Sequence, residues 1–255
     1  MITILSPAKT IDENPENGFD RLENPIFLKE ANYLAGLLKK SSASRLRKLM
    51  NISQDLAELN QERFMGWDPE ILKWKDLPAL LAFKGEVFRG ANASEWSTRE
   101  LEYSIDHLVI LSGLFGLLRP NNRIRPYRLE MGTPLKNRAG SDLYDFWRKK
   151  LTQAFLKVMD DEGSGILVNL ASNEYFKVLD KKLLKARTIT PGFKDFHNGS
   201  YKFLTVYGKH ARGLMTRFIM SNQIEDPEEL KAFDENGYTF NPRLSKGDDW
   251  VFTRG

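Results

Sequence analysis

The stretch Leu111-Ser-Gly-Leu-Phe-Gly-Leu-Leu-Arg-Pro120 runs on through Asn121-Asn-Arg-Ile-Arg-Pro126 to Tyr127-Arg-Leu-Glu-Met-Gly132. Its apolar first half, residues 111–118, contains two glycines and is typical of closely packed, buried backbone. The second half contains Arg119, Arg123, Arg125 and Arg128, and no acidic residue occurs between Asp106 and Glu130. We therefore expect this stretch to form the floor and the cationic rim of an anion-binding site.

The composition around this stretch is that of a folded domain. The chain has 255 residues, 41% of them hydrophobic, including 16 Phe, 8 Tyr and 5 Trp. This is enough apolar material for a sizeable core. No low-complexity linker and no internal repeat interrupts the chain, so we expect one compact domain over residues 1–255. The net charge of +4 permits a nucleic-acid partner but does not require one.

Several function classes are disfavoured by composition. The chain has no cysteine, which excludes disulfides and thiol-based peroxidase or redox chemistry. The three histidines, His107, His197 and His210, have no metal-ligand spacing, which disfavours zinc and haem and leaves a carboxylate-rich site as the remaining metal alternative. No motif for such a site is present, so we expect neither a metal nor a cofactor. The N-terminal run Met1-Ile-Thr-Ile-Leu5 is too short for a signal peptide, and no apolar run approaches the about 20 residues of a membrane span. We expect a cytoplasmic protein without a membrane partner.

Short apolar runs indicate strands at residues 2–5, 79–83, 108–112, 166–170 and 250–252, and residues 188–191 and 201–206 suggest an antiparallel portion. Helical periodicity covers residues 26–40, 141–158 and 207–219. This alternation predicts a mixed α/β fold around a central mixed sheet. Polar side chains follow the runs: Lys9, Lys84, and the group Asn173, Glu174 and Lys177. Ligands often bind at the carboxyl ends of strands, although ordinary polar turns have the same pattern.

The helical segment at residues 207–219 has an apolar face opposite Lys209 and Arg212. Charged helix faces are usually solvated. Here, however, no acidic residue occurs between Asp195 and Glu225. The missing acids favour an anion-facing surface, so this interpretation and a solvated helix face stand as equal alternatives.

Residues 44–59 read as two short helices with a tight connection. The side chains expected to face inward are Leu46 and Leu49 of the first helix and Leu56, Ala57 and Leu59 of the second. The outline matches a helix-hairpin-helix, which offers backbone N–H groups to a nucleic-acid phosphate. Asn51 and Ser53 stand where the motif usually has glycines, so a plain helical hairpin is an equal alternative. The preceding cations, which include Lys48, favour the phosphate-binding interpretation.

Six segments resemble, in order, the YaaA family of bacterial peroxide stress proteins. They are Ser6-Pro-Ala-Lys-Thr10, Phe83-Lys-Gly-Glu-Val-Phe88, Leu111 to Pro120, Pro126-Tyr-Arg-Leu-Glu-Met-Gly132, Asn169-Leu-Ala-Ser-Asn-Glu-Tyr-Phe-Lys177 and Ala211-Arg-Gly-Leu-Met-Thr-Arg-Phe-Ile219. The resemblance implies a single domain of unusual topology with a positively charged cleft and a helix-hairpin-helix. It also implies binding of double-stranded or distorted DNA without strong sequence preference. The implied role is to limit damage from hydrogen peroxide, associated with keeping intracellular iron low.

The first functional hypothesis is therefore DNA binding by a monomer in the oxidative stress response. Because the chain lacks the usual iron ligands, an effect on iron is expected to be indirect. The predicted DNA and phosphate contacts are Lys9, Lys48, Asn51, Ser53, Lys84, Arg119, Arg125, Tyr127, Arg128, Lys177, Lys209 and Arg212.

The alternative hypothesis is an enzyme that acts on a nucleotide or nucleobase in a basic pocket. It rests on the predicted pocket carboxylates and amide, Glu130, Asn173 and Glu174, beside Tyr127 and the cations. In the competing structural interpretation, Glu130 and Glu174 pair with Arg128 and Lys177 to fix loops. We assign no catalytic residue from the sequence.

Overall fold

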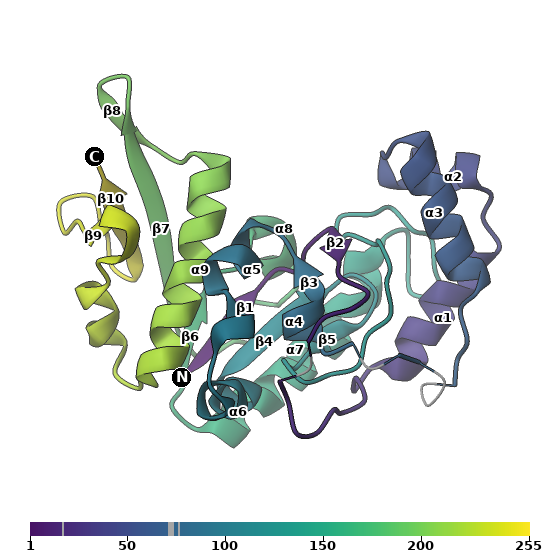
Figure 1. Ribbon diagram of the computed structural model, residues 1–255, viewed down its shortest axis with the longest axis horizontal. Coiled ribbons are helices and arrows are strands. Elements are labelled where there is room, and N and C mark those ends of the chain that lie inside the picture. Colours follow the sequence, from purple (N-terminus) through teal and green to yellow (C-terminus); the bar gives the residue numbers. More distant parts are fainter. Residues whose placement is uncertain (17, 71–73, 76) are drawn as a thin grey trace.

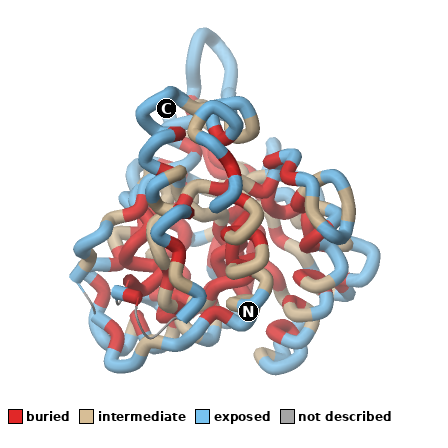
Figure 2. The backbone as a smooth tube through the Cα atoms, turned by 90° about the vertical axis from the view of Figure 1, so that its right-hand side faces the viewer, coloured by how far each residue is buried: buried red, intermediate tan, exposed pale blue. Residues whose placement is uncertain are grey.

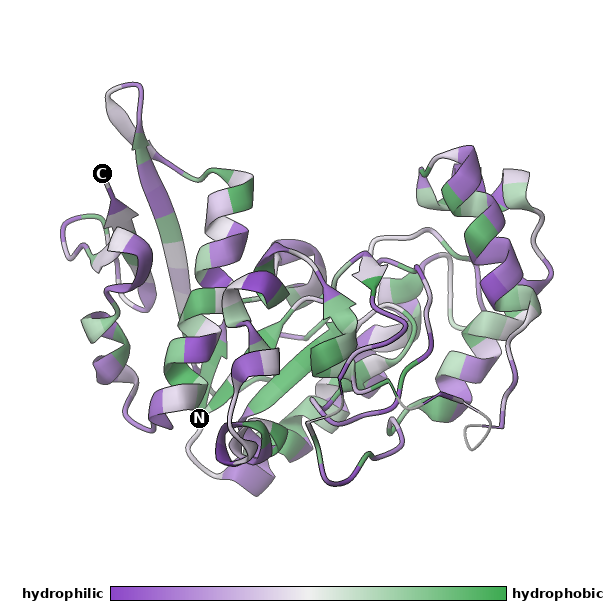
Figure 3. Cartoon of the chain, viewed as in Figure 1, coloured by the Kyte–Doolittle hydropathy of each residue, from purple (hydrophilic) through white to green (hydrophobic). Residues whose placement is uncertain are grey.

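Three short apolar strands form the centre of the molecule: β1 (Ile2–Leu5), β4 (Leu108–Ser112) and β6 (Ile166–Asn169). The computed structural model describes residues 1–16, 18–70, 74–75 and 77–255. In it, β1 lies between β4 and β6, parallel to both, and pairs Ile4 with Val109 and with Asn169. The strands are hydrophobic nearly throughout (Figure 3), as is typical of parallel strands covered on both faces.

Eight of the ten described strands form a mixed sheet in the order β5-β4-β1-β6-β7-β10-β9, with β8 paired to β7. β5 (Gly116–Leu118) and β9 (Thr239–Phe240) are antiparallel edge strands, whereas β7 (Arg187–His197) is parallel to both β6 and β10 (Asp249–Arg254). β8 (Ser200–Lys202) folds back on the end of β7 as a hairpin that projects above the sheet (Figure 1). The predicted α/β fold with a mixed sheet in one compact domain is confirmed.

Helices pack along the sheet. α6 (Thr98–His107) begins at a capping box formed by Ser97 and Glu100, and it packs on β1 and β4. α7 (Leu143–Glu162) begins at the Asp142 cap and packs on β5. α9 (Thr205–Asn222) packs on β7 and also crosses α5 (Glu86–Ala91). The buried backbone lies in the centre, and exposed residues follow the outer helices and loops (Figure 2).

The crossing of α5 and α9 depends on two glycines. A Cβ atom on Gly90 would lie 2.2 Å from the His210 carbonyl oxygen, and one on Gly213 would lie 1.9 Å from the Val87 carbonyl oxygen. Side chains at either position would push the helices apart. The close approach holds the first turns of α9 beside the start of α5.

α1 (Leu28–Lys39), α2 (Ala43–Met50) and α3 (Gln54–Met65) lie at the other end of the molecule from β8 and α9 (Figure 1). Asn51 ends α2 in the left-handed conformation, and Ser53 caps α3. The inward side chains of α3 are Ala57, Asn60 and Phe64, whereas Leu56 and Leu59 are exposed. Ala57 faces inward as predicted, but the prediction is wrong for Leu56 and Leu59, because the buried face of the helix is the one that carries Ala57, Asn60 and Phe64.

The prediction of a strand over residues 79–83 is also wrong. Ala79–Ala82 forms the one-turn helix α4, which follows Pro78, and only Phe83–Lys84 is extended as β3. β3 pairs with β2 (Thr10–Ile11) in a separate two-stranded sheet. The predicted strand at residues 201–206 is correct only at its beginning, because β8 ends at Lys202 and α9 starts at Thr205.

The remaining elements are short: α8 (Asn173–Phe176) and the 3-10 helices η2 (Ala93–Glu95), η3 (Pro227–Ala232) and η4 (Glu235–Gly237). Among the described helices, none has the length and apolar character needed to cross a bilayer.

Candidate functional site

A pocket of about 390 Å³ lies at the carboxyl ends of β1 and β6. Five segments contribute to it: residues 6–10 after β1, residues 84–88 at the start of α5, residues 127–130, residues 170–175 around α8, and the first turns of α9. The parallel pairing of β1 with β6 brings the loops that follow them to one edge. The pocket therefore unites five of the six segments that carried the family resemblance.

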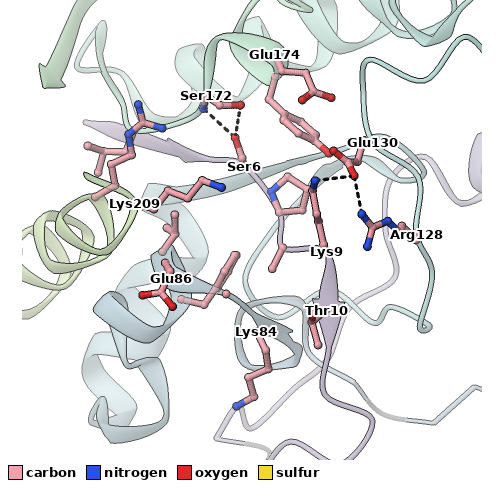
Figure 4. Close-up of a pocket in the computed structure, with 18 of the residues that line it drawn as sticks. Ser6, Lys9, Thr10, Lys84, Glu86, Arg128, Glu130, Ser172, Glu174 and Lys209 are labelled. Carbon is pink, nitrogen blue, oxygen red and sulfur yellow. Dashed lines mark hydrogen bonds and ion pairs between the residues drawn. The ribbon is translucent and has the colours of Figure 1, made fainter. Parts of the chain in front are cut away.

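Glu130 lies between two cations in this pocket (Figure 4). Its Oε1 is 3.2 Å from Lys9 Nζ and 3.2 Å from Arg128 Nη2. The Arg128 side chain is 15% exposed, and its buried Nε has no hydrogen-bond partner among the described atoms. The Glu130–Arg128 pair is thus present, and Lys9 joins it. The carboxylate neutralises only part of the positive charge of this wall.

The first turns of α9 supply two further cations, Lys209 and Arg212. Neither forms an ion pair with any residue that the structure describes. The Arg212 guanidinium carbon lies 5.7 Å from the ring centre of Phe203. Burial lowers the pKa of Arg212 from its ordinary value, since the charged form loses hydration. A desolvated guanidinium that lines a pocket favours an anionic ligand.

Lys84 and Glu86 line another side of the pocket. Lys84 Nζ lies 3.4 Å from Asp12 Oδ2, and its ammonium points away from Glu130 (Figure 4). Hydrogen bonding from the Asn14 backbone, with a smaller contribution from Lys84, lowers the pKa of Asp12. Glu86 pairs with Arg89 at 2.8 Å and lies 3.8 Å from His210 Nδ1. Lys84 is therefore already partly neutralised, unlike Lys209.

Three hydrogen bonds fix the loops around the pocket. The Ser6 hydroxyl accepts a bond from the Ser172 backbone N–H (2.9 Å) and donates one to Ser172 Oγ (3.2 Å). Glu174 Oε1 accepts a bond from the Gly132 backbone N–H (2.8 Å). The anticipated pairing of Glu174 with Lys177 is not what orders this loop. Glu174 nevertheless lines the pocket and fixes the loop after Glu130.

The floor beneath the charged groups is apolar. Tyr127 is buried, and its hydroxyl lies 2.6 Å from the Ser112 hydroxyl, at the end of β4. Burial raises the pKa of Tyr127 far above its ordinary value, so the phenol stays neutral. The Ser112 oxygen also accepts bonds from the Leu114 and Phe115 backbone N–H groups. Residues 111–118 are buried as predicted, but none of them lines the pocket, so of the opening stretch only residues 127–130 reach it. Tyr127 contributes its ring rather than a titrating group.

The other predicted site residues of the central segments lie outside this pocket. Asn173 is exposed beside it, and Lys177 Nζ lies 4.4 Å from the ring centre of Tyr144. Arg119 donates to the Asp106 carbonyl (3.3 Å). Arg125 donates to the Gly66 carbonyl (3.0 Å) and lies over the rings of two tryptophans, Trp67 and Trp74. These contacts give Arg119 and Arg125 structural partners.

Lys48 lies on α2, Asn51 follows the end of that helix and Ser53 precedes α3, and all three are exposed. The Ser53 hydroxyl accepts a bond from the Leu56 backbone N–H (3.4 Å). α2 and α3 therefore form a capped helical pair that carries an exposed lysine beside the connection.

Sequence reasoning missed Glu86 and Tyr175 as pocket residues. Glu86 follows Lys84 and Gly85 directly. The sequence therefore located its segment at the site through Lys84, but did not mark Glu86 itself as a site residue. Tyr175 is buried, and burial raises its pKa well above the ordinary value. No pattern in the sequence distinguishes it from a core tyrosine.

The fold and the site define a mixed α/β protein with a cation-lined pocket at the carboxyl edge of its parallel strands. A family model described as "Peroxide stress protein YaaA" matches residues 1–244. The chain therefore belongs to the YaaA family of peroxide stress proteins. It is 44% identical over 254 residues to a UPF0246 protein of Janthinobacterium sp. (strain Marseille), covering 100% of this chain and 98% of that protein. It is equally similar to a UPF0246 protein of Ralstonia pickettii (strain 12J), covering 100% and 99%.

Proposed function

We propose that this protein binds double-stranded or distorted DNA in the cytoplasm, without strong sequence preference, and thereby limits damage during peroxide stress. Lowering of iron is then an indirect effect. The observation that supports the proposal best is the pair Lys209 and Arg212 on α9. Both line the pocket, and neither has a carboxylate partner among the described residues. Cations elsewhere do pair, as Arg187 does with Asp248 at 2.8 Å.

Phosphate binding accounts for this arrangement physically. Lys and Arg contacts to phosphates release condensed counterions and are indifferent to base sequence. A DNA phosphate would supply Arg212 with an anionic hydrogen-bond acceptor in place of the hydration that burial removes. The affinity should therefore fall steeply with salt. Lys9 and Arg128 extend the same cationic surface, although Glu130 offsets part of their charge.

The α2–α3 pair is the second part of the proposed DNA surface. α2 carries Arg45, Arg47 and Lys48, and none of them forms an ion pair within the described part of the chain. α2–α3 and the β7–β8 hairpin project on the same side of the molecule, and the pocket segments lie between them (Figure 1). A helix-hairpin-helix role for Asn51 and Ser53 belongs to this proposal.

Binding of a labelled duplex over a salt series tests the proposal. Replacing both Lys209 and Arg212 by Ala should weaken affinity at least about tenfold, because hydrogen bonds to charged groups contribute about 1.5–3 kcal/mol each. The slope of log affinity against log salt should fall by about 0.9 per lost phosphate contact. The matched control replaces Lys149 and Lys157, two exposed lysines of α7, and should bind normally.

Salt-independent affinity, or equal losses in the test and control variants, would refute DNA binding through α9. The stress role has its own readout, which is survival of peroxide by a deletion strain that carries each variant. The Lys209 and Arg212 variant should fail to protect, and the control variant should protect.

A second candidate function is an enzyme that acts on a nucleotide or nucleobase. The specific observation is Glu130, a carboxylate held between Lys9 and Arg128 in a pocket of nucleotide size. Such a group could accept a proton or a base hydrogen bond while the cations hold a phosphate. A nucleotide and nucleoside panel, assayed with the wild type and with Glu130→Gln, tests it. Turnover lost in Glu130→Gln supports the enzyme, whereas absence of both binding and turnover rejects it.

A further inference from the structure

The β7–β8 hairpin and the start of α9 expose four aromatic rings: Phe196, Tyr201, Phe203 and Tyr207. Their exposed fractions lie between 36% and 54%. Phe196 and Tyr201 are directly opposed in the antiparallel register, so their rings lie on one face of the hairpin, with centres 5.3 Å apart. The hairpin is the topmost projection of the molecule in Figures 1 and 2. Large exposed rings gathered on one projecting segment are typical of a binding surface.

The charges beside these rings indicate what binds them. The Arg212 guanidinium lies over Phe203, and the Arg254 guanidinium lies 4.9 Å from the ring centre of Tyr207. No acidic residue occurs between Asp195 and Glu225. Asp195 itself is buried, and it accepts bonds from Arg254 and Tyr238. Rings interleaved with cations in an acid-free segment fit a partner that has both flat apolar groups and anions.

Phe203 connects this surface to the pocket. Its ring lies against Gly208 of α9, where a Cβ atom would come within 2.2 Å of it. Phe203 also contacts Arg212, which lines the pocket. Phe203 follows β8 directly in the chain, so it links the hairpin that carries Phe196 and Tyr201 to the cationic wall that we assign to phosphates.

From this continuity we infer that the hairpin rings bind unpaired nucleotides, by stacking on bases whose phosphates contact the α9 cations. This inference rests on the proposed DNA binding and assigns a separate part of it to Phe196, Tyr201 and Phe203. In a paired duplex the bases already stack on one another, so the rings have no access to base faces. Single strands and unpaired segments offer those faces, and such stacking is tolerant of sequence.

The test measures binding of an oligothymidylate strand and of a fully paired duplex of the same length to the full chain. The double variant Phe196→Leu with Tyr201→Leu keeps apolar side chains and removes both rings. Its affinity for the strand should fall about tenfold or more, and its affinity for the duplex should stay within about twofold of the wild type. Tyr201→Phe, which loses only the hydroxyl bond to the Gly255 carbonyl (3.1 Å), should bind the strand normally. Leu183→Ala, at another exposed apolar side chain, is the matched control and should also bind normally.

Unchanged strand affinity in the double leucine variant would overturn the inference, and so would an equal loss on the duplex. Ring-dependent capture of anionic phospholipid vesicles with no ring-dependent binding of the strand would assign the rings to a membrane surface instead. Ring-dependent dimerisation would assign them to a second copy of the chain. The duplex measurement distinguishes the proposed DNA binding by α9 from the inferred base stacking on the hairpin rings. Duplex binding that depends on Lys209 and Arg212 preserves the proposed function even if the rings prove irrelevant.

Discussion

Gly116 occupies a position where both the backbone and a neighbouring ring exclude a side chain. Its φ is +71°, and a Cβ atom would lie 2.7 Å from the Trp147 ring. Gly163 ends α7 at φ +86°, yet apart from its chain neighbours and its own helix no described atom lies within 4 Å of its Cβ position. We expect Gly163→Ala to lower the free energy of unfolding by about 1–2 kcal/mol through backbone strain alone. Gly116→Ala should cost about 1–3 kcal/mol more, through overpacking. Urea denaturation measures both variants, and equal losses would contradict the packing argument.

The pKa of Tyr103 should differ between the folded and the unfolded chain. Burial raises its pKa to about 12, assisted by the negative charges of Glu225 and Glu162. In the unfolded chain the phenol ionises near pH 10, at about its ordinary pKa. The folded state thus holds the proton more tightly, so this contribution to stability is complete below about pH 10 and is lost as the pH rises through about 12. The difference in tyrosinate absorbance between the wild type and Tyr103→Phe should have its midpoint near 12. A midpoint near 10 would show that the site is hydrated.

At the level of elements, α2 and α3 are predicted to form a DNA contact of their own. Lys48 is exposed beside the connection that Asn51 and Ser53 make. Replacing Lys48 with Ala should weaken binding of all duplex sequences alike and reduce the salt slope by about 1. Lys40→Ala, at the end of α1, is the matched exposed control. A Lys48 variant that binds like the control would make α2–α3 a structural hairpin only.

The elements that periodicity could define were predicted well. Residues 2–5, 108–112 and 166–169 are strands as expected, and the stripe at residues 141–158 is α7. The apolar run at residues 79–83 is too short and too uniformly apolar for its periodicity to distinguish one helical turn from a strand. Pro78 precedes it, and pairing of Asn122 and Pro120 carbonyls with the Ala79 and Leu80 N–H groups completes the turn. Those partners are distant in the sequence, so local reasoning could not find them.

At the scale of the whole molecule, the sequence indicated which segments would meet at one pocket. It did not indicate which of their side chains would remain without a structural partner. Lys9, Lys84, Arg128, Glu130 and Lys209 do line one pocket, because their segments follow neighbouring strands or lie on α9. Arg125 has the same charge and lies in the same arginine-rich stretch, yet it is held by Trp67, Trp74 and Gly66. Partners of this kind depend on tertiary packing, since α3 and the loop after it must first be placed beside residue 125. The functional roles of the pocket residues remain predictions.

α2 and α9 are separated along the longest axis of the molecule (Figure 1). If one DNA molecule contacts both, the free-energy losses of Lys48→Ala and Lys209→Ala should add to within about 0.5 kcal/mol on a duplex long enough to reach both ends. On a duplex too short to do so, binding at α9 should be insensitive to Lys48→Ala. A series of shortened duplexes, titrated with each single variant and the double variant, measures this. A Lys48 effect that is the same at every length would mean that α2 and α9 contact the DNA close together, and the proposed path across the pocket would then be wrong.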